Sequence, residues 1–257
     1  KSILVCALTV MVVLSGLCFA EKPATQQARR ILDATGVEGG LIVHLDCNDG
    51  RLTRALRADD SFVVQGLDTS ASDVQKARAY LAEQGVCGPV SVRQFDGQTL
   101  PYVDNTVSLV LAEGLGDLAM AEVRRVLKPH GVAYIDGEKT VKPRPGDIDE
   151  WTHFLHDSGG NAVAEDEQIH PPKALRWVAG PLHCRSHEFP SSVQGVVTTE
   201  GRIFTILDEA PSGVFAKLPQ ECKLVARDAF NGKLLWKVPL RKWSEEYGTG
   251  SGGRWNI

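Results

Sequence analysis

The sequence predicts an α/β fold, a parallel sheet covered by helices on both faces, followed by a second region that is all β. Short apolar runs alternate with segments of helical period between residues 24 and 135. After residue 145 the helical period fades and two hairpin patterns replace it. Residues 139–149, rich in proline and charge, form a predicted linker between the two regions.

The first region contains four helix patterns and five strand patterns. Helices are predicted at 24–34, 52–56, 72–84 and 121–126, and strands at 41–45, 62–67, 90–95, 107–112 and 132–135. Gly36 and Gly85 follow two of these helices, as expected for residues that end a helix. Strands separated by helices at this spacing imply a parallel sheet with right-handed crossovers. Such a sheet binds ligands beyond the carboxyl ends of its strands.

The most informative segment is Ala121–Ile135, AEVRRVLKPHGVAYI. An amphipathic helix with Glu122, Arg124 and Arg125 runs into a Pro-His-Gly sequence and then an apolar strand. Because proline and glycine both interrupt helices, we predict that the helix stops at a turn there. The pattern E-x-x-R-V-L-K-P-x-G closely resembles the late helix-strand unit of class I S-adenosylmethionine (SAM)-dependent methyltransferases, of the methyltransferase type 11-like kind.

The resemblance covers about residues 24–138 and has consequences for fold, cofactor and activity. It implies a Rossmann-like, doubly wound sheet that binds SAM and transfers its methyl group to a small-molecule or otherwise unknown acceptor. Motifs for recognition of a methyl acceptor, such as Asn-Pro-Pro-Tyr, are absent from the sequence. No residue is therefore nominated as catalytic.

The methyltransferase family that the sequence resembles has a G-x-G-x-G cofactor loop, and this pattern aligns with the segment after the first predicted strand. Asp46 and Asn48 replace the first two glycines, Gly50 keeps the third, and His44 stands where an acidic residue often sits. Asn and Asp tolerate left-handed backbone best among residues with side chains, so the turn itself can survive. Asp46 adds bulk and negative charge near the place of the cofactor's carboxylate, although the same charge could meet its amino group.

Two further aspartates complete the predicted cofactor site. Asp68 follows the second strand, where the resemblance implies a carboxylate that holds the ribose hydroxyls. A helix N-cap or turn aspartate explains Asp68 equally well. Asp96, followed by a Leu-Pro-Tyr segment, resembles the residue that meets the adenine amino group, with a plain turn aspartate as the alternative. Glu113 falls in the region lining the active site, or is a solvated loop residue.

The second region contains two predicted hairpins. Residues 193–198 and 202–207 flank Glu200-Gly201, and residues 223–229 and 233–238 flank Asn231-Gly232. The second hairpin matches A-x-D-x-x-x-G-x-x-x-W and resembles a blade of quinoprotein (PQQ-like) β-propellers. The resemblance implies an incomplete propeller whose further blades lie beyond this sequence. PQQ is expected as a cofactor only if those further blades supply its ligands. Protein partners could bind to the propeller.

The N-terminal sequence predicts export. A lone basic residue, a short apolar run and a small residue at Ala20 are typical of a secretory signal peptide. We therefore predict four parts: signal peptide 1–20, methyltransferase-like domain 21–140, junction 141–175 and blade segment 176–257. The protein would be periplasmic or secreted, with no membrane span after cleavage. Because the chain starts at Lys1 and stops after a Gly/Ser-rich run, we expect a fragment.

Charge and cysteine content exclude two classes of function. With 28 basic and 32 acidic residues and no basic run, the chain is not expected to bind nucleic acid. Outside the predicted signal peptide, cysteines occur at 47, 87, 184 and 222 without any C-x-x-C pair, so a zinc site is not expected. Cys184 could pair with Cys222 in an exported protein, or all four could be small buried residues.

A histidine-rich junction follows the linker, in Trp151–Asp157 and again around His183 and His187. His153 and His156 would share one face of a helix, which is a spacing compatible with metal binding. Histidines flanked by aromatic residues more often pack and form hydrogen bonds, so no metal ligands are assigned.

Three functions follow from these patterns. The first is a SAM-dependent methyltransferase domain fused to a PQQ-like propeller. The second is a catalytically inactive module of the same fold beside an exported propeller, favoured by the altered loop and because SAM is made in the cytoplasm. The third is a quinone-dependent dehydrogenase whose chemistry would reside in the missing blades.

Overall fold

The computed structural model describes residues 23–167, 175–180, 193–210 and 221–240. The first region folds into α2 (Pro23–Thr35), β1 (Gly40–Leu45), α3 (Arg51–Ala55), β2 (Phe62–Asp68), α4 (Ala71–Glu83), β3 (Val90–Gln94), β4 (Val107–Ala112), α5 (Met120–Val126), β5 (Leu127–Ile135) and β6 (Glu138–Val141). The second consists of β7 (Val193–Thr199), β8 (Arg202–Asp208), β9 (Cys222–Asp228) and β10 (Leu234–Pro239). Within these ranges, no helix has the length and apolarity needed to cross a membrane.

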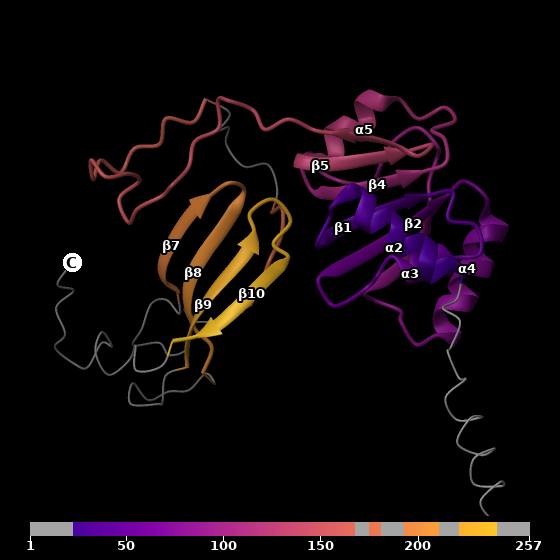
Figure 1. Ribbon diagram of the computed structural model, residues 1–257, viewed down its shortest axis with the longest axis horizontal. Helices are drawn as coiled ribbons and strands as arrows, with labels where there is room; N and C mark the ends of the chain where they lie inside the picture. Colours follow the sequence, from indigo (N-terminus) through magenta and orange to yellow (C-terminus); the bar gives the residue numbers. More distant parts are fainter. Residues whose placement is uncertain (1–22, 168–174, 181–192, 211–220, 241–257) are drawn as a thin grey trace, which may run out of the picture.

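The first region is a six-stranded sheet of order β3-β2-β1-β4-β5-β6 (Figure 1). Strands β1 to β5 are parallel, and β6 pairs antiparallel with β5 at the edge. The order reverses at β1, between β2 and β4, which places the switch point of the sheet beside the β1 loop. The predicted parallel α/β sheet is confirmed, and its helix and strand positions agree with prediction within a few residues.

Two apolar clusters lie on opposite faces of this sheet. One contains Ile42, Val64 and Leu109 from the strands, packed against residues of α2, α3 and α4. The other contains Val43 and Val110, packed against α5. Neighbouring strand residues thus point to opposite faces, and both faces are buried, as a doubly wound sheet requires.

Two local predictions are wrong. The strand after α5 begins at Leu127 rather than Val132, so the Pro-His-Gly sequence lies inside β5, where His130 takes a left-handed φ of 61°. The β4–β5 register shifts between Val107 and Leu109, which accommodates this irregularity. The predicted linker also starts with ordered structure, because its first residues pair with β5 as strand β6.

The second region is a four-stranded antiparallel sheet of order β10-β9-β8-β7. Its β7–β8 and β9–β10 pairs are the two predicted hairpins, which the strand pairing confirms. At the β9–β10 turn, the Asp228 carboxylate accepts the backbone N–H groups of Phe230 and Asn231. Gly232 follows with φ 72°, and a Cβ there would come within 2.4 Å of the Trp177 ring. The Asn-Gly signal thus identified a turn that only glycine fits.

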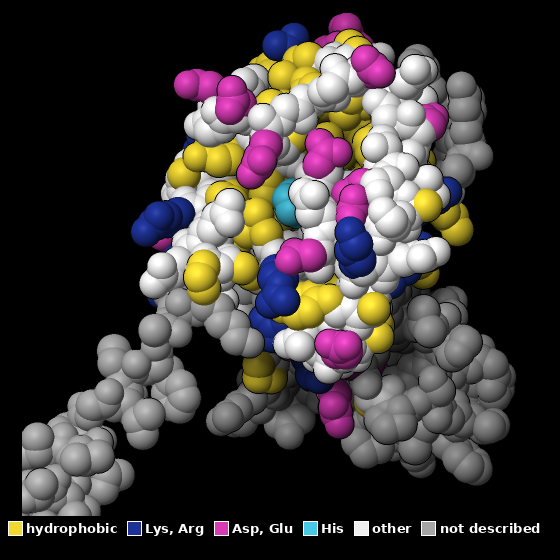
Figure 2. All heavy atoms as spheres, turned by 90° about the vertical axis from the view of Figure 1, so that its right-hand side faces the viewer, with side chains coloured by type: hydrophobic (Ala, Val, Ile, Leu, Met, Phe, Trp, Pro, Cys, Tyr) yellow, Lys and Arg dark blue, Asp and Glu magenta, His cyan; other side chains and the backbone are white. Residues whose placement is uncertain are grey.

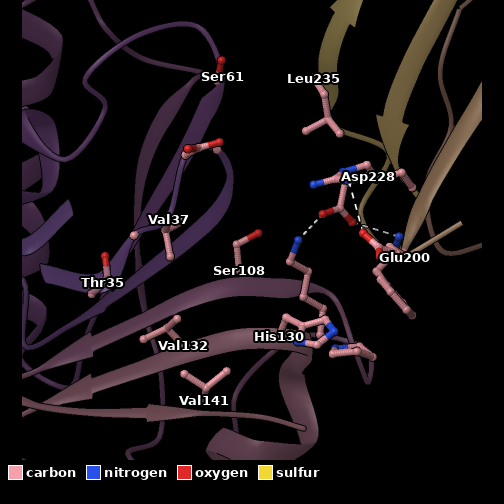
Figure 3. A pocket seen from close by; sticks show the side chains of 18 of the residues that line it. Thr35, Val37, Ser61, Ser108, His130, Val132, Val141, Glu200, Asp228 and Leu235 are labelled. Carbon is pink, nitrogen blue, oxygen red and sulfur yellow. Dashed lines mark hydrogen bonds and ion pairs between the residues drawn. The ribbon is translucent and has the colours of Figure 1, made fainter. Parts of the chain in front are cut away.

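The second sheet contacts the amino-terminal edge of the first one. Asn231 Nδ2 donates to the Thr106 carbonyl and to Ser108 Oγ, both at 3.2 Å. Lys128 at the start of β5 forms an ion pair with the buried Asp228. A cavity of about 1210 Å³ lies beside these contacts (Figure 3). The carboxyl ends of the parallel strands point the other way in Figure 1.

Candidate functional site

The loop after β1 keeps a strained backbone without the glycines that usually permit it. Asp46 has φ 51° and Asn48 has φ 48°, and Gly50 follows with φ 76°. The Asn48 side chain folds back onto the loop, because its Nδ2 donates to the Asp46 carbonyl at 2.6 Å. This local hydrogen bond is one that Asn can make and Gly cannot, and it offsets part of the cost of left-handed backbone.

Asp68 joins this loop to the end of β2. It is buried, and its Oδ2 accepts the Asn48 N–H at 3.0 Å while Oδ1 accepts the Ser70 N–H at 2.9 Å. The N-cap of α4 is Ser70, whose hydroxyl accepts the Asp73 N–H, so Asp68 is a turn aspartate rather than the cap itself. Each carboxylate oxygen has two lone pairs, so one acceptor position on each remains for another donor.

Gly50 and Gly66 are required by packing around the loop. A Cβ at Gly50 would lie 3.0 Å from the Cβ of Ala77 on α4. A Cβ at Gly66, in β2, would lie 2.8 Å from the Cβ of Cys47. The glycine kept from the family pattern therefore allows α3 to approach α4. Gly66 was not predicted as part of the site, although an isolated glycine inside a strand indicates such a close approach.

His44 is buried under the loop. Its Nδ1 lies 2.9 Å from the Thr53 hydroxyl of α3. Burial lowers the pKa of His44 to about 4, while the Asp68 charge opposes this shift. The imidazole is therefore neutral at pH 7 and does not replace the charge of an acidic residue. Thr53 was not identified from the sequence, because the pairing of β1 with α3 is a tertiary contact.

Asp96 lies at the same edge, beyond the end of β3. In the β2–β3 pairing, Asp68 lies opposite Gln94, and the Phe95 N–H donates to the Asp68 carbonyl at 3.1 Å. Asp96 is the next residue, so it lies close to the end of β2. Its Oδ1 accepts the N–H groups of Gln98 and Thr99, which lower the pKa of this exposed carboxyl. Asp96 thus has the turn role that the sequence left as an alternative, and the residue is exposed.

The carboxyl edge is acidic. Burial raises the pKa of Asp46, and the nearby Asp68 and Glu113 charges raise it further. Figure 2 shows this end of the molecule, with acidic side chains around a histidine. The structure thus brings six predicted residues to one edge: His44, Asp46, Asn48, Gly50, Asp68 and Asp96.

Cys47 packs in the core, and His153 and His156 form hydrogen bonds in the described part of the chain. Burial raises the pKa of the Cys47 thiol to about 12, which makes it a poor nucleophile. His153 and His156 lie in a tight turn rather than on a helix, and His156 Nε2 contacts Asp149 Oδ2 at 2.6 Å. No group of metal-ligating side chains occurs in the described ranges.

Residues 183, 184 and 187 lie outside the described ranges. The pairing of Cys184 with Cys222 and any role of the second histidine pair stay predictions.

Residues 42–131 match the family model described as "Methyltransferase domain". The comparisons thus support a methyltransferase-like domain in this part of the chain. Two curated relatives are named ubiquinone/menaquinone biosynthesis C-methyltransferase. The one from Saccharophagus degradans is 26% identical over 76% of this chain and 76% of its own length. The one from Teredinibacter turnerae is 34% identical over 40% of each chain.

Among solved structures, a SAM-dependent methyltransferase from Aquifex aeolicus is 20% identical, with a TM-score of 0.40. The match covers 44% of this chain and 66% of the Aquifex chain. Another match, from Methanococcus maripaludis, covers 54% of that chain. The matched part of this chain thus covers 66% or less of these two solved chains.

Proposed function

We propose that the methyltransferase domain binds SAM at the carboxyl edge of its sheet and transfers the methyl group to a small acceptor. The observation that carries this proposal is the β1 loop. Its backbone stays left-handed at Asp46 and Asn48, and Asp68 fastens it to the end of β2. This left-handed backbone is the feature that the glycines of a cofactor loop usually permit, and it persists although Asp46 and Asn48 replace two of the three.

The described residues can hold the adenosine part of this cofactor. Asp68 would accept the ribose hydroxyls with its remaining lone pairs, and the exposed Asp96 carboxylate would accept the adenine amino group. SAM would supply an electrophilic methyl group on its sulfonium. The chain would contribute orientation, and proximity of the bound reactants would account for most of the rate. No residue is assigned as a base.

A carbon atom is the acceptor class that the names of the relatives suggest, since both are called C-methyltransferases. We extend this to the present chain as part of the proposal. The region around Glu113, after β4, is where the acceptor would approach.

Calorimetric titration of the whole chain with SAM tests the proposal. Asp96→Ala should weaken SAM binding about tenfold, because it removes an acceptor from an exposed position without touching the core. Asp104→Ala is the matched control, since this exposed carboxylate pairs with Arg125 and precedes β4 at the opposite edge. Absence of any SAM binding, or equal loss in both variants, would overturn the proposal.

An inactive module is the second candidate. It is supported by the contacts of Asp68, which already accepts two backbone N–H groups without any ligand. A chain that binds SAM but gives no methylated product with a panel of quinol and phenol acceptors would favour it.

We also propose that the four-stranded sheet is a blade of a PQQ-like propeller in an exported protein. The meander order and the turn built on Asp228 and Gly232 support a blade, and the apolar N-terminal run supports export. Trp236 lies with its ring centroid 5.9 Å from that of Phe204 on the same sheet. Cell fractionation with and without residues 1–20 tests export. A fluorescence titration of the full-length protein with PQQ and calcium tests for a quinone site.

A further inference from the structure

The cavity of about 1210 Å³ lies between the two regions, at the amino edge of the six-stranded sheet (Figure 3). The α2–β1 loop and the start of β5 line it on one side, and β10 with the β7–β8 and β9–β10 turns lines it on the other. A volume of this order holds a drug-sized molecule. The cavity lies at the opposite end of the parallel strands from the β1 loop, so it is separate from the proposed SAM site.

Strand irregularities on both sides direct consecutive residues toward this cavity. In a regular strand, neighbouring side chains point to opposite faces. The β9–β10 register shifts between Leu234 and Trp236, and both Leu235 and Trp236 line the cavity. On the other side, the β4–β5 register shifts, and the consecutive residues 128–130 of β5 all line the cavity. Such irregularities are common beside active sites, because they redirect side chains.

The walls of the cavity are apolar and only partly covered. Leu235 is 37% exposed, Trp236 42% and Val141 of β6 47%, although all three line the cavity. The centroid of the Trp236 ring lies 5.9 Å from that of Phe204, which lines the cavity too. Burial of these surfaces against a ligand is favourable, and a flat ring can stack on the indole. The walls therefore favour a ligand with an aromatic body.

The floor of the cavity offers hydrogen-bond donors. Ser108 is buried on β4, and its Oγ accepts Asn231 Nδ2 at 3.2 Å. Its own O–H has no acceptor among the contacts of the described residues, and the side chain lines the cavity (Figure 3). The Lys128 ammonium has three N–H groups, of which the contact with Asp228 uses one. A ligand at the floor would therefore need to supply hydrogen-bond acceptors.

The carboxylates around the floor are already engaged. Asp228 is buried, and it accepts from Lys128 and from two N–H groups of the β9–β10 turn. Glu200 lies 3.7 Å from Arg202 in an ion pair, and Glu38 is an exposed residue of the lining. These carboxylates do not compete for the Ser108 O–H. The charge of Asp228 also opposes a second negative charge on a ligand bound beside Lys128.

One cation of the lining adds to the attraction for a single negative charge. Lys139 of β6 donates to the Ala34 carbonyl at 3.3 Å, and it has no carboxylate partner in the described part of the chain. Arg144, by contrast, lines the cavity but pairs with Glu150 at 2.9 Å. The charged groups thus suit a ligand with one carboxylate better than a neutral or doubly charged one.

We propose that this cavity binds an aromatic monocarboxylate, with its carboxylate at Ser108 and Lys128 and its ring against Trp236 and Leu235. Such a ligand would contact both regions, because Ser108 and Lys128 belong to the first and Trp236 and Leu235 to the second. Its binding should therefore raise the midpoint of thermal unfolding. The inference does not depend on whether SAM binds at the carboxyl edge.

Calorimetric titration of the whole chain with 1-naphthoate tests the proposal. The neutral probe of the same shape is 1-naphthamide, and 1-naphthyl phosphate provides two negative charges at pH 8. The naphthoate should bind about tenfold more tightly than either of the others, because it alone combines one charge with the aromatic body. Absence of naphthoate binding overturns the proposal, as does equal or tighter binding of the amide or the phosphate.

Variants of β10 locate the bound ring. Trp236→Ala should weaken naphthoate binding about tenfold, whereas Trp236→Phe keeps an aromatic ring and should cost about twofold. Val238→Ala is the matched control, since Val238 lies on the same strand, is 49% exposed and is not among the described residues that line the cavity. It should leave binding unchanged. Equal losses in Trp236→Ala and Val238→Ala, or in Trp236→Ala and Trp236→Phe, would overturn the position of the ring.

Ser108→Ala tests the floor. It removes the hydroxyl that would donate to the carboxylate, so the tenfold preference for naphthoate over naphthamide should fall to about threefold. Because the preference compares two ligands on the same variant, a general loss of stability does not produce this change. An unchanged preference would overturn the role of Ser108.

Discussion

The two ends of the six-stranded sheet differ in what lies against them. At the amino end, Asn231 and Asp228 of the second sheet contact β4 and β5 directly. At the carboxyl end, the contacts found among the described residues of the β1 loop come from the same region, through Asp68 and Asn48. The amino end thus attaches the second sheet, and the carboxyl end is where we propose that SAM binds.

The two ends therefore differ in whether their interactions stabilise the fold or favour binding. The contacts at the amino end are hydrogen bonds and an ion pair between complementary groups. Their loss should therefore lower the free energy of unfolding. The carboxyl end contains carboxylates that repel each other, an arrangement that costs stability and suits a cationic ligand.

Asp228→Ala breaks the attachment at the amino end. It leaves the ammonium of Lys128 without its partner in a position where its side chain is only 21% exposed, and it frees the N–H groups of the β9–β10 turn. We expect the free energy of unfolding to fall by about 3 kcal/mol in urea titrations. Asp60→Ala, which removes a fully solvated partner of Arg57, should change little. Equal midpoints for both variants would contradict this.

His44 makes the carboxyl end sensitive to acid. Its pKa is about 4 in the folded protein and 6.5 for a free histidine, so the unfolded chain binds a proton first. Stability should therefore fall as the pH drops from 6.5 to 4, by up to about 3 kcal/mol.

His44→Gln can still bind the Thr53 hydroxyl but does not titrate, so unfolding curves across this range should be flatter. His153→Gln is the control, because this histidine is exposed. The same pH slope in wild type and His44→Gln would show that the burial of His44 has no such effect.

Gly50→Ala tests whether the glycine that the β1 loop retains serves packing. Its left-handed φ of 76° strains any side chain, and its Cβ would also press on Ala77 at 3.0 Å. We expect a loss of about 2 kcal/mol. Gly85→Ala has a similar φ of 65° with nothing within 4 Å, so it should lose only the strain, about 1 kcal/mol. Thermal unfolding of the pair separates the two contributions; identical losses would argue against the packing role.

The sequence predicted the fold well because its signals are local. Helical periodicity, apolar runs and the Asn231-Gly232 turn depend on neighbours within a few residues. Strand β6 was missed because its residues are all exposed and follow no apolar alternation, and only pairing with β5 makes them a strand. The early start of β5 was missed because a register shift accommodates its Pro-His-Gly sequence.

The edge of the sheet at which the candidate residues lie could be predicted from the sequence, whereas their contacts could not. Asp68 and Asp96 could be placed at strand ends from the sequence, whereas the hydrogen bonds that already engage both depend on how the loop folds. The neutral state of His44 likewise follows from burial against Thr53, which no spacing along the chain reveals. The charge around Asp46 combines residues at or just after the ends of β1, β2 and β4, so it arises only when the sheet assembles.

Attachment at the amino end has a practical consequence for work with this protein. A tag, a fluorophore or a sensor surface coupled through β8 or β9 would be anchored at the amino end of the six-stranded sheet, and the β1 loop lies at the opposite, carboxyl end of its strand. Immobilisation in that orientation would leave diffusion of small molecules to the loop unobstructed. A larger assembly that binds the first region through the same amino-end contacts would leave the β1 loop accessible.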